Sequence, residues 1–149
     1  MGLGTELAEL IVLEHRYRPL PPTVHTLGRL VTGFDFEEAQ ALIRRCGVEP
    51  SPTIPALDTF TVEGRRGGGR TITDTTFFRM LGVQDIHAID ISAYEGATIV
   101  WDLCQPIPDT IANVADFIVG GSTLDNVFTR RNTLEISHAC FDREGVCLK

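Results

Sequence analysis

Three short apolar runs in the middle of the chain each end in a polar or glycine-containing turn. They cover residues 86–91, 97–101 and 117–119. Runs of this length that do not alternate between apolar and polar residues are typical of strands buried on both faces of a parallel sheet. The pattern therefore predicts an α/β protein in which these runs form neighbouring strands.

Apolar residues at helical spacing predict three helices outside these runs. The predicted helices cover residues 5–18, 35–47 and 74–82. Asp35 is a residue type that often caps a helix N-terminus, and Gly47 is typical of a helix end. At the other two helices we expect Thr5, and either Asp74 or Thr75, to act as N-caps.

A β-branched run at residues 24–32, interrupted by Gly28, precedes the second predicted helix. We expect the first core strand at 24–28, because β-branched residues favour strands. Residues 54–58 are the alternative first strand. With the strand at 24–28, residues 48–73 become an insertion in the core.

Length and charge narrow the class of protein. At 149 residues the chain is expected to form one domain. We expect a first helix with a proline-rich link at residues 1–22, a ligand-binding core at 23–128 and a divergent end at 129–149. The net charge of −7 argues against unspecific binding to nucleic acid or to anionic membranes. No apolar run approaches the roughly 20 residues that a membrane-spanning helix needs.

The cysteines and histidines do not predict a metal site. The 4 cysteines form no Cys-x-x-Cys pair, and the 4 histidines are not closely spaced. We therefore expect reduced, partly buried thiols. The N-terminus lacks the pattern of a secretory signal, so a cytoplasmic protein is expected.

Polar and small residues follow the apolar runs where a ligand site is expected. Asp90 and Asp102 lie near the ends of the first two runs, and residues 120–122 (Gly-Gly-Ser) follow the third. In an open parallel sheet the carboxyl ends of the strands form the ligand crevice. Each acid also has a structural interpretation: Asp90 as a strand-end residue and Asp102 as a turn residue.

Several segments of the chain resemble a known family. Residues 88–92 (AIDIS), 101–103 (WDL) and 115–128 (ADFIVGGSTLDNVF) resemble the second, third and fourth strands of class I S-adenosylmethionine-dependent methyltransferases. The likeness extends to an uncharacterised bacterial branch of methyltransferase-like proteins. It implies a Rossmann-like, mostly parallel sheet flanked by helices, and S-adenosyl-L-methionine as cofactor.

The resemblance also implies roles for individual residues around the cofactor. Asp90 would bind the ribose hydroxyls, and its neighbour Ile91 would be a further cofactor-binding position. Asp102 would accept a hydrogen bond from the adenine amino group, with the Leu103 amide close by. Gly28 would allow the backbone to approach the methionine part, although a plain strand glycine is equally compatible with the sequence.

The remaining positions implied by the resemblance lie at the end of the fourth strand. Gly120, Gly121 and Ser122 would form the floor beneath the sulfur, and Asp125 and Asn126 would face the methyl acceptor. Asp125 could instead cap a helix. The N-terminus of the helix at 35–47 would act through its dipole on the carboxylate of the cofactor.

The function implied is methyl transfer to a small-molecule or sugar-type acceptor. The alternatives are a catalytically inactive Rossmann-like binding or scaffold module, and a nicotinamide-dependent oxidoreductase, against which the missing GxGxxG motif speaks. Residues 129–149 depart from the family pattern, and the terminal strands of the methyltransferase fold are expected to be missing. An open sheet edge would then favour a homodimer.

Overall fold

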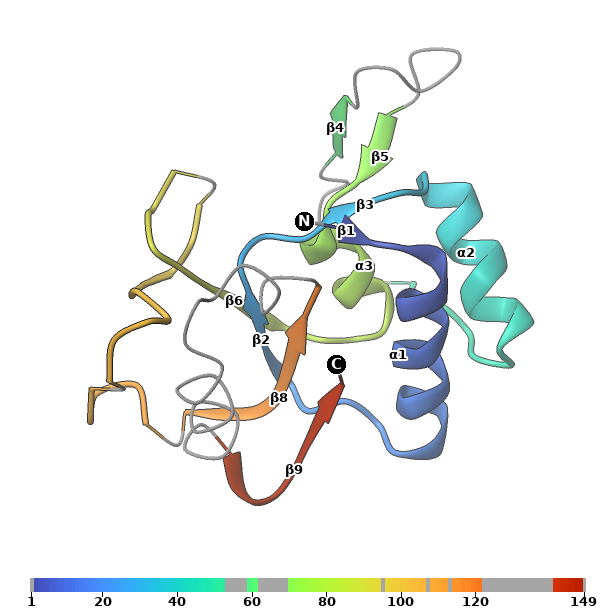
Figure 1. The fold of residues 1–149 in the computed structure, drawn as a ribbon. Helices are drawn as coiled ribbons and strands as arrows, with labels where there is room; N and C mark the ends of the chain where they lie inside the picture. The colour runs from blue at the N-terminus through green and yellow to red at the C-terminus, as the bar shows by residue number, and fades with distance from the viewer. Residues whose placement is uncertain are drawn as a thin grey trace. The chain divides into compact units, whose positions relative to one another are not determined.

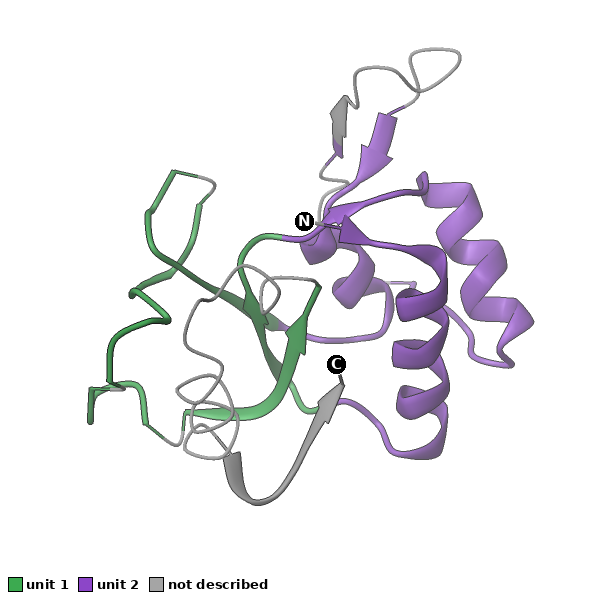
Figure 2. Ribbon diagram, in the orientation of Figure 1, with its two compact units in different colours: residues 1, 21–29, 85–149 green, residues 2–20, 30–84 purple. Residues whose placement is uncertain are grey.

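The chain divides into two compact units (Figure 2). Residues 21–29 and 85–149 form the sheet unit, and residues 2–20 and 30–84 form the helical unit. The computed structural model describes the backbone of residues 2–52, 59–61, 70–94, 96–106, 108–112, 114–121 and 141–148, and the side chains of all of these except 60, 61 and 141–148.

The sheet unit contains a five-stranded sheet in which every neighbouring pair of strands is parallel (Figure 1). In spatial order the strands are β7 (Ile99–Val100), β6 (Asp85–Asp90), β2 (Thr23–Leu27), β8 (Ala115–Gly120) and β9 (Phe141–Leu148). Within this sheet the first strand along the chain is the central β2. The chain then adds β6 and β7 on one side of β2, and β8 and β9 on the other. This order is that of a doubly wound α/β sheet, with the reversal between β2 and β8.

The strand order confirms the expectation of an α/β protein with a parallel sheet, and it is consistent with a Rossmann-like fold. It also identifies β2 as the first core strand, because β2 occupies the centre of the sheet. The alternative strand at 54–58 lies outside the described residues.

An aliphatic cluster fixes the sheet near the carboxyl ends of its strands. Ile89 of β6 and Ile118 of β8 are buried on either side of β2, where Leu27 is buried as well. The members of this cluster are Leu27, Ile89, Leu103, Ala115 and Ile118, with Ile99 and Trp101 packed against them. Burial of such side chains stabilises the fold by roughly 1.5–3 kcal/mol each.

The β-branched run at 24–32 does not form one strand. Its first part is β2, whereas β3 (Val31–Thr32) pairs with β1 (Gly2–Leu3) in a separate two-stranded sheet of the helical unit. Gly28 lies just beyond β2 with φ 74°, a left-handed conformation that glycine adopts without steric cost. The chain therefore leaves the sheet at Gly28 rather than continuing through it.

Residues 129–149, expected to be a divergent end that lacks terminal strands of the methyltransferase fold, contain a fifth strand of the parallel sheet. β9 (Phe141–Leu148) pairs in parallel with β8, with Phe117 opposite Val146 and Val119 opposite Leu148. Its pairing satisfies main-chain groups that β8 would otherwise expose at a sheet edge. The strand begins earlier than the apolar residues near the end of the chain indicate, and residues 122–140 lie outside the described part.

The resemblance implied a sheet flanked by helices, but two of the connections between strands are loops in their described residues. The residues described between β6 and β7, and between β7 and β8, contain no helix. Eight residues, 91–98, join β6 to β7, fewer than the roughly twelve that a helical crossover requires. The loop reverses where the Gly96 N–H donates to the Ala93 oxygen over 3.0 Å, with Gly96 at φ 76°.

The helical unit contains three helices and two small pairs of strands. The helices are α1 (Thr5–Tyr17), α2 (Phe36–Arg45) and α3 (Asp74–Met80), and the second strand pair is β4 (Thr59–Thr61) with β5 (Arg70–Ile72). The antiparallel β4–β5 ladder lies in the segment expected to be an insertion, 48–73. No helix among the described residues has the length and apolar character needed to cross a membrane.

Of the three predicted N-caps in this unit, one is confirmed and two are wrong. Asp35 caps α2 as expected, and its carboxylate accepts from the Glu38 N–H while the Glu38 side chain accepts from the Asp35 N–H. At α1 the cap is Gly4, because the helix already includes Thr5. At α3 the cap is Thr73, whose hydroxyl accepts from the Thr76 N–H.

Aromatic packing and long-range hydrogen bonds stabilise the helical unit. Phe77 is fully buried, and its ring packs edge-on against Phe34 and Phe78 with centroid distances of 5.6 and 5.7 Å. The buried carboxylate of Asp74 accepts a hydrogen bond from the Leu30 N–H over 2.9 Å. This bond connects two segments that are far apart in the sequence.

Candidate ligand-binding edge of the sheet

The carboxyl ends of four parallel strands lie at one edge of the sheet, and residues predicted from the sequence follow them. Asp90 is the last residue of β6, Asp102 follows β7 by two residues, and Gly120 is the last residue of β8. Gly28 follows β2 directly. Because these strands are parallel neighbours, their carboxyl ends share one edge, called here the carboxyl edge.

Asp90 lies half-buried at the carboxyl edge and contributes to it in two ways. Its main-chain oxygen accepts a hydrogen bond from the Trp101 N–H over 2.8 Å, which connects β6 to the end of β7. Its Oδ1 accepts from the Ser92 N–H over 3.4 Å. Asp90 is therefore fixed at the strand end while its side chain caps the following turn.

Asp102 belongs to a tighter turn than Asp90. Its Oδ1 accepts from the Cys104 N–H over 2.8 Å, and its main-chain oxygen accepts from the Gln105 N–H over 2.9 Å. This is the turn role that the sequence had allowed. It holds the carboxylate at a defined position beside the end of β7.

Gly28 and Gly120 lie at the point where the strand order reverses. Leu27, the residue before Gly28, is opposite Gly120 in the β2–β8 pairing. The Gly28 N–H donates to the Ile89 oxygen over 2.7 Å. Because neither glycine has a side chain, a ligand can approach the backbone closely at this reversal.

The other predicted residues occupy different environments. Ile91 is 69% exposed at the carboxyl edge, while Leu103 is buried in the aliphatic cluster, so its side chain supports the edge from within. Gly121 is buried next to Gly120. Ser122, Asp125 and Asn126 lie outside the described residues.

The donor and acceptor chemistry of the carboxyl edge fits an adenosine. In each of the two carboxylates, Asp90 and Asp102, Oδ1 accepts a hydrogen bond from another described residue. For Oδ2 of each carboxylate the described residues supply no donor, so this oxygen can accept from a ligand. Ribose hydroxyls and the adenine amino group are donors, so they match carboxylate oxygens. Within the described residues, no group of three or more potential metal ligands is assembled.

The expected role of the α2 N-terminus does not fit the structure. Its capping box already uses the Glu38 N–H and the Asp35 N–H. Two acidic residues, Glu37 and Glu38, lie in its first turn. Their negative charge opposes the approach of a ligand carboxylate, so the helix dipole has no evident part in binding one.

A pair of histidines on adjacent strands was missed from the sequence. His25 of β2 is opposite His87 of β6, with ring centroids 5.3 Å apart. Burial is the main cause that lowers the pKa of His25, the His87 imidazole adds to it, and Asp116 acts in the opposite direction. The similar segments 24–26 (VHT) and 86–88 (IHA) would have indicated this pair once a parallel in-register pairing was assumed.

Nδ1 of His25 is buried and has no hydrogen-bond partner among the described residues, whereas Nδ1 of His87 lies 3.2 Å from the Thr98 hydroxyl. Both histidines lie in the interior of their strands, before the carboxyl edge. Their position indicates a part in the stability of the sheet.

Comparison of the chain with protein families, curated proteins and solved structures finds no match.

Proposed function

We propose that the chain binds S-adenosylmethionine at the carboxyl edge and transfers its methyl group to a small-molecule or sugar-type acceptor. The observation that supports this most is the position of Asp90 and Asp102 at the carboxyl ends of adjacent parallel strands. The glycines at the β2–β8 reversal support it further, because ligands of open α/β sheets bind at that point.

In this proposal the residues of the chain bind and orient. Asp90 would accept hydrogen bonds from the ribose hydroxyls, and Asp102 one from the adenine amino group. Ile91, which is 69% exposed, offers an apolar surface for the base. The cofactor supplies an electrophilic methyl group, and the protein's contribution is alignment of the acceptor and exclusion of water.

The proposal is tested by calorimetry with S-adenosylhomocysteine, using variants at the two ends of one strand. Asp90→Ala is expected to weaken binding about 10- to 100-fold, because hydrogen bonds to a charged group contribute about 1.5–3 kcal/mol. Asp85→Ala is the matched control, since Asp85 is an exposed acid at the amino end of the same strand, β6. No heat with the unaltered chain, or equal weakening by both variants, would refute the proposal.

A binding or scaffold module without turnover is the second candidate. The turn bonds of Asp90 and Asp102 favour it, because both carboxylates already have a structural task. The short β6–β7 connection favours it too, since it lacks the helix found in the catalytic fold that the chain resembles. Binding of S-adenosylhomocysteine, combined with no methylation of any acceptor in a broad radiolabel screen, would select this candidate.

A further inference from the structure

Helix α1 has an exposed apolar stripe on the side opposite its buried face. Ala8, Ile11 and Val12 are fully buried. Leu10, Leu13 and Tyr17, by contrast, are exposed by 53%, 42% and 89%. Their spacing of three and four residues places them on one side of the helix, as in the seam of a coiled coil.

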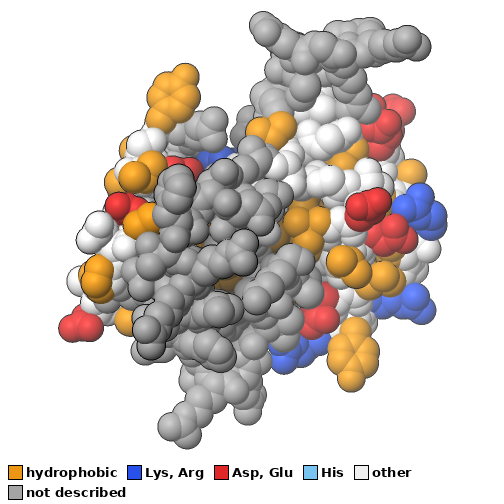
Figure 3. All heavy atoms as spheres, in the orientation of Figure 1, with side chains coloured by type: hydrophobic (Ala, Val, Ile, Leu, Met, Phe, Trp, Pro, Cys, Tyr) orange, Lys and Arg blue, Asp and Glu red, His pale blue; other side chains and the backbone are white. Residues whose placement is uncertain are grey.

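The charges beside this stripe are distributed unevenly along the helix. Glu6 and Glu9 lie in its first half, whereas Arg16 lies in its last turn. Glu9 and Arg16 are seven positions apart, so they lie on the same flank of the stripe. Figure 3 shows hydrophobic, acidic and basic side chains close together over the region of α1.

We propose that this face of α1 binds α1 of a second copy of the chain in antiparallel orientation. A two-fold axis would place Leu10 of each copy against Leu13 of the other. The same axis brings the same flank of both helices together, so Glu9 of each copy faces Arg16 of the other. In parallel orientation opposite flanks of the two helices would meet, so Glu9 of each copy would face Glu14 of the other, and like charges would repel.

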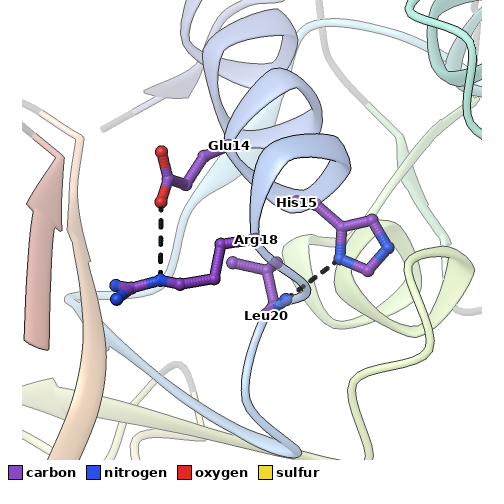
Figure 4. Close-up of polar contacts among 4 residues, drawn as sticks. All are labelled: Glu14, His15, Arg18 and Leu20. Carbon is purple, nitrogen blue, oxygen red and sulfur yellow. Dashed lines mark hydrogen bonds and ion pairs between the residues drawn. The ribbon is translucent and has the colours of Figure 1, made fainter.

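The existing contacts of these charges leave this arrangement open. The Glu9 carboxylate lies 3.5 Å from Arg45 in an exposed ion pair, and such pairs contribute little. Arg16 donates to the Cys46 main-chain oxygen over 3.2 Å, so its guanidinium lies at the C-terminal end of α2 and is held by a partly buried main-chain contact rather than by a carboxylate. Glu14 and Arg18 pair with each other along the helix (Figure 4), so they do not compete for the same flank.

The small area of the stripe limits the affinity expected for the dimer. A single helix pair covers less than the roughly 800 Å² per partner of a stable interface. The dimer should therefore be weak and depend on concentration, and sedimentation velocity over a wide concentration range measures it. A chain that remains monomeric up to millimolar concentration would overturn the proposal.

Two substitutions distinguish this face from the sheet edge. Leu13→Gln should weaken dimerisation at least tenfold, because the two-fold axis repeats the Leu10–Leu13 contact and the substitution therefore removes it at two places. Val100→Lys should leave it unchanged, since Val100 is 57% exposed on the edge strand β7, far from α1 in sequence. If Val100→Lys abolishes the dimer and Leu13→Gln does not, the association uses the sheet edge and the proposal fails.

Charge exchange tests the orientation. Glu9→Arg alone and Arg16→Glu alone should each weaken self-association several-fold, because each variant presents only like charges on this flank. An equimolar mixture of the two variants should dimerise again, since the introduced arginine then faces the introduced glutamate in one pair and the native Arg16 faces the native Glu9 in the other. Circular dichroism of each variant verifies that α1 remains helical, and failure of the mixture to associate would overturn the antiparallel arrangement.

Discussion

The helical unit and the sheet unit are stabilised by different kinds of interaction. In the helical unit, side chains cap helices within a few residues, and the rings of Phe34, Phe77 and Phe78 pack together. In the sheet unit, parallel main-chain pairing and one aliphatic cluster connect segments that are distant in sequence. The first unit therefore depends mainly on side-chain identity, and the second mainly on which strands become neighbours.

This difference explains where a binding edge can arise. No local motif brings Gly28, Asp90 and Gly120 together at the carboxyl edge, because Gly28 follows β2, Asp90 ends β6 and Gly120 ends β8. The entire helical part from residue 30 to 84 lies between β2 and β6 in the sequence. Only the parallel pairing of β2 with β6 and β8 unites them.

The largest effect is expected from the aromatic cluster of the helical unit. Phe77→Ala should lower the free energy of unfolding by about 3–5 kcal/mol, because it leaves a cavity between two rings. Urea unfolding followed by circular dichroism measures it. Tyr94→Ala is the control, since Tyr94 is 92% exposed and its loss should change stability by less than about 0.5 kcal/mol. A loss below about 1 kcal/mol for Phe77→Ala would contradict the importance given to this cluster.

A somewhat smaller effect is expected in the aliphatic cluster of the sheet unit. Ile89→Ala should lower the free energy of unfolding by about 3 kcal/mol, and Ile89→Val by about 1 kcal/mol. If the two units unfold separately, Phe77→Ala and Ile89→Ala should shift different transitions in a calorimetric scan. One common transition for both variants would show that the two units unfold as one cooperative body.

The capping box of α2 tests the local interactions of the helical unit. Asp35→Ala should cost about 1 kcal/mol, because the Glu38 N–H loses its partner. Glu37→Ala is the matched control: Glu37 is an acid of the same first turn that takes no part in the box, so a few tenths of a kcal/mol are expected. Equal losses from the two variants would mean that charge near the helix N-terminus, rather than the cap, stabilises α2.

The smallest effect is expected from pH, through the histidines. Burial lowers the pKa of His25 in the sheet unit and that of His15 in the helical unit below the ordinary value of 6.5. The unfolded chain therefore binds more protons than the folded chain in acid. The contribution of these two histidines to the free energy of unfolding is fully present above pH 6.5 and declines as the pH falls toward their lower folded pKa values.

Urea unfolding at a series of pH values, compared between the unaltered chain and His25→Gln, isolates the contribution of the sheet unit. The variant should show a smaller decline on acidification. An NMR titration in which His25 gains its proton above pH 6.5 would contradict this interpretation.

Much of the local structure followed from the sequence. The N-cap at Asp35 and the helix end near Gly47 were both apparent in the residue pattern, because each depends on neighbours a few positions away. The short apolar runs likewise predicted β6 and β8. The expected caps of α1 and α3 were displaced by one or two residues, as helix ends commonly are.

The tertiary structure decided what the pattern left open. The sequence left the first core strand open between 24–28 and 54–58, and pairing with β6 and β8 selected Thr23–Leu27, while Val31–Thr32 pairs in another sheet. It also made Phe141–Leu148 a fifth strand and brought Asp90 and Asp102 to the same edge. These outcomes depend on hydrogen bonds between residues far apart in the chain, and such partners are chosen only when the whole sheet assembles.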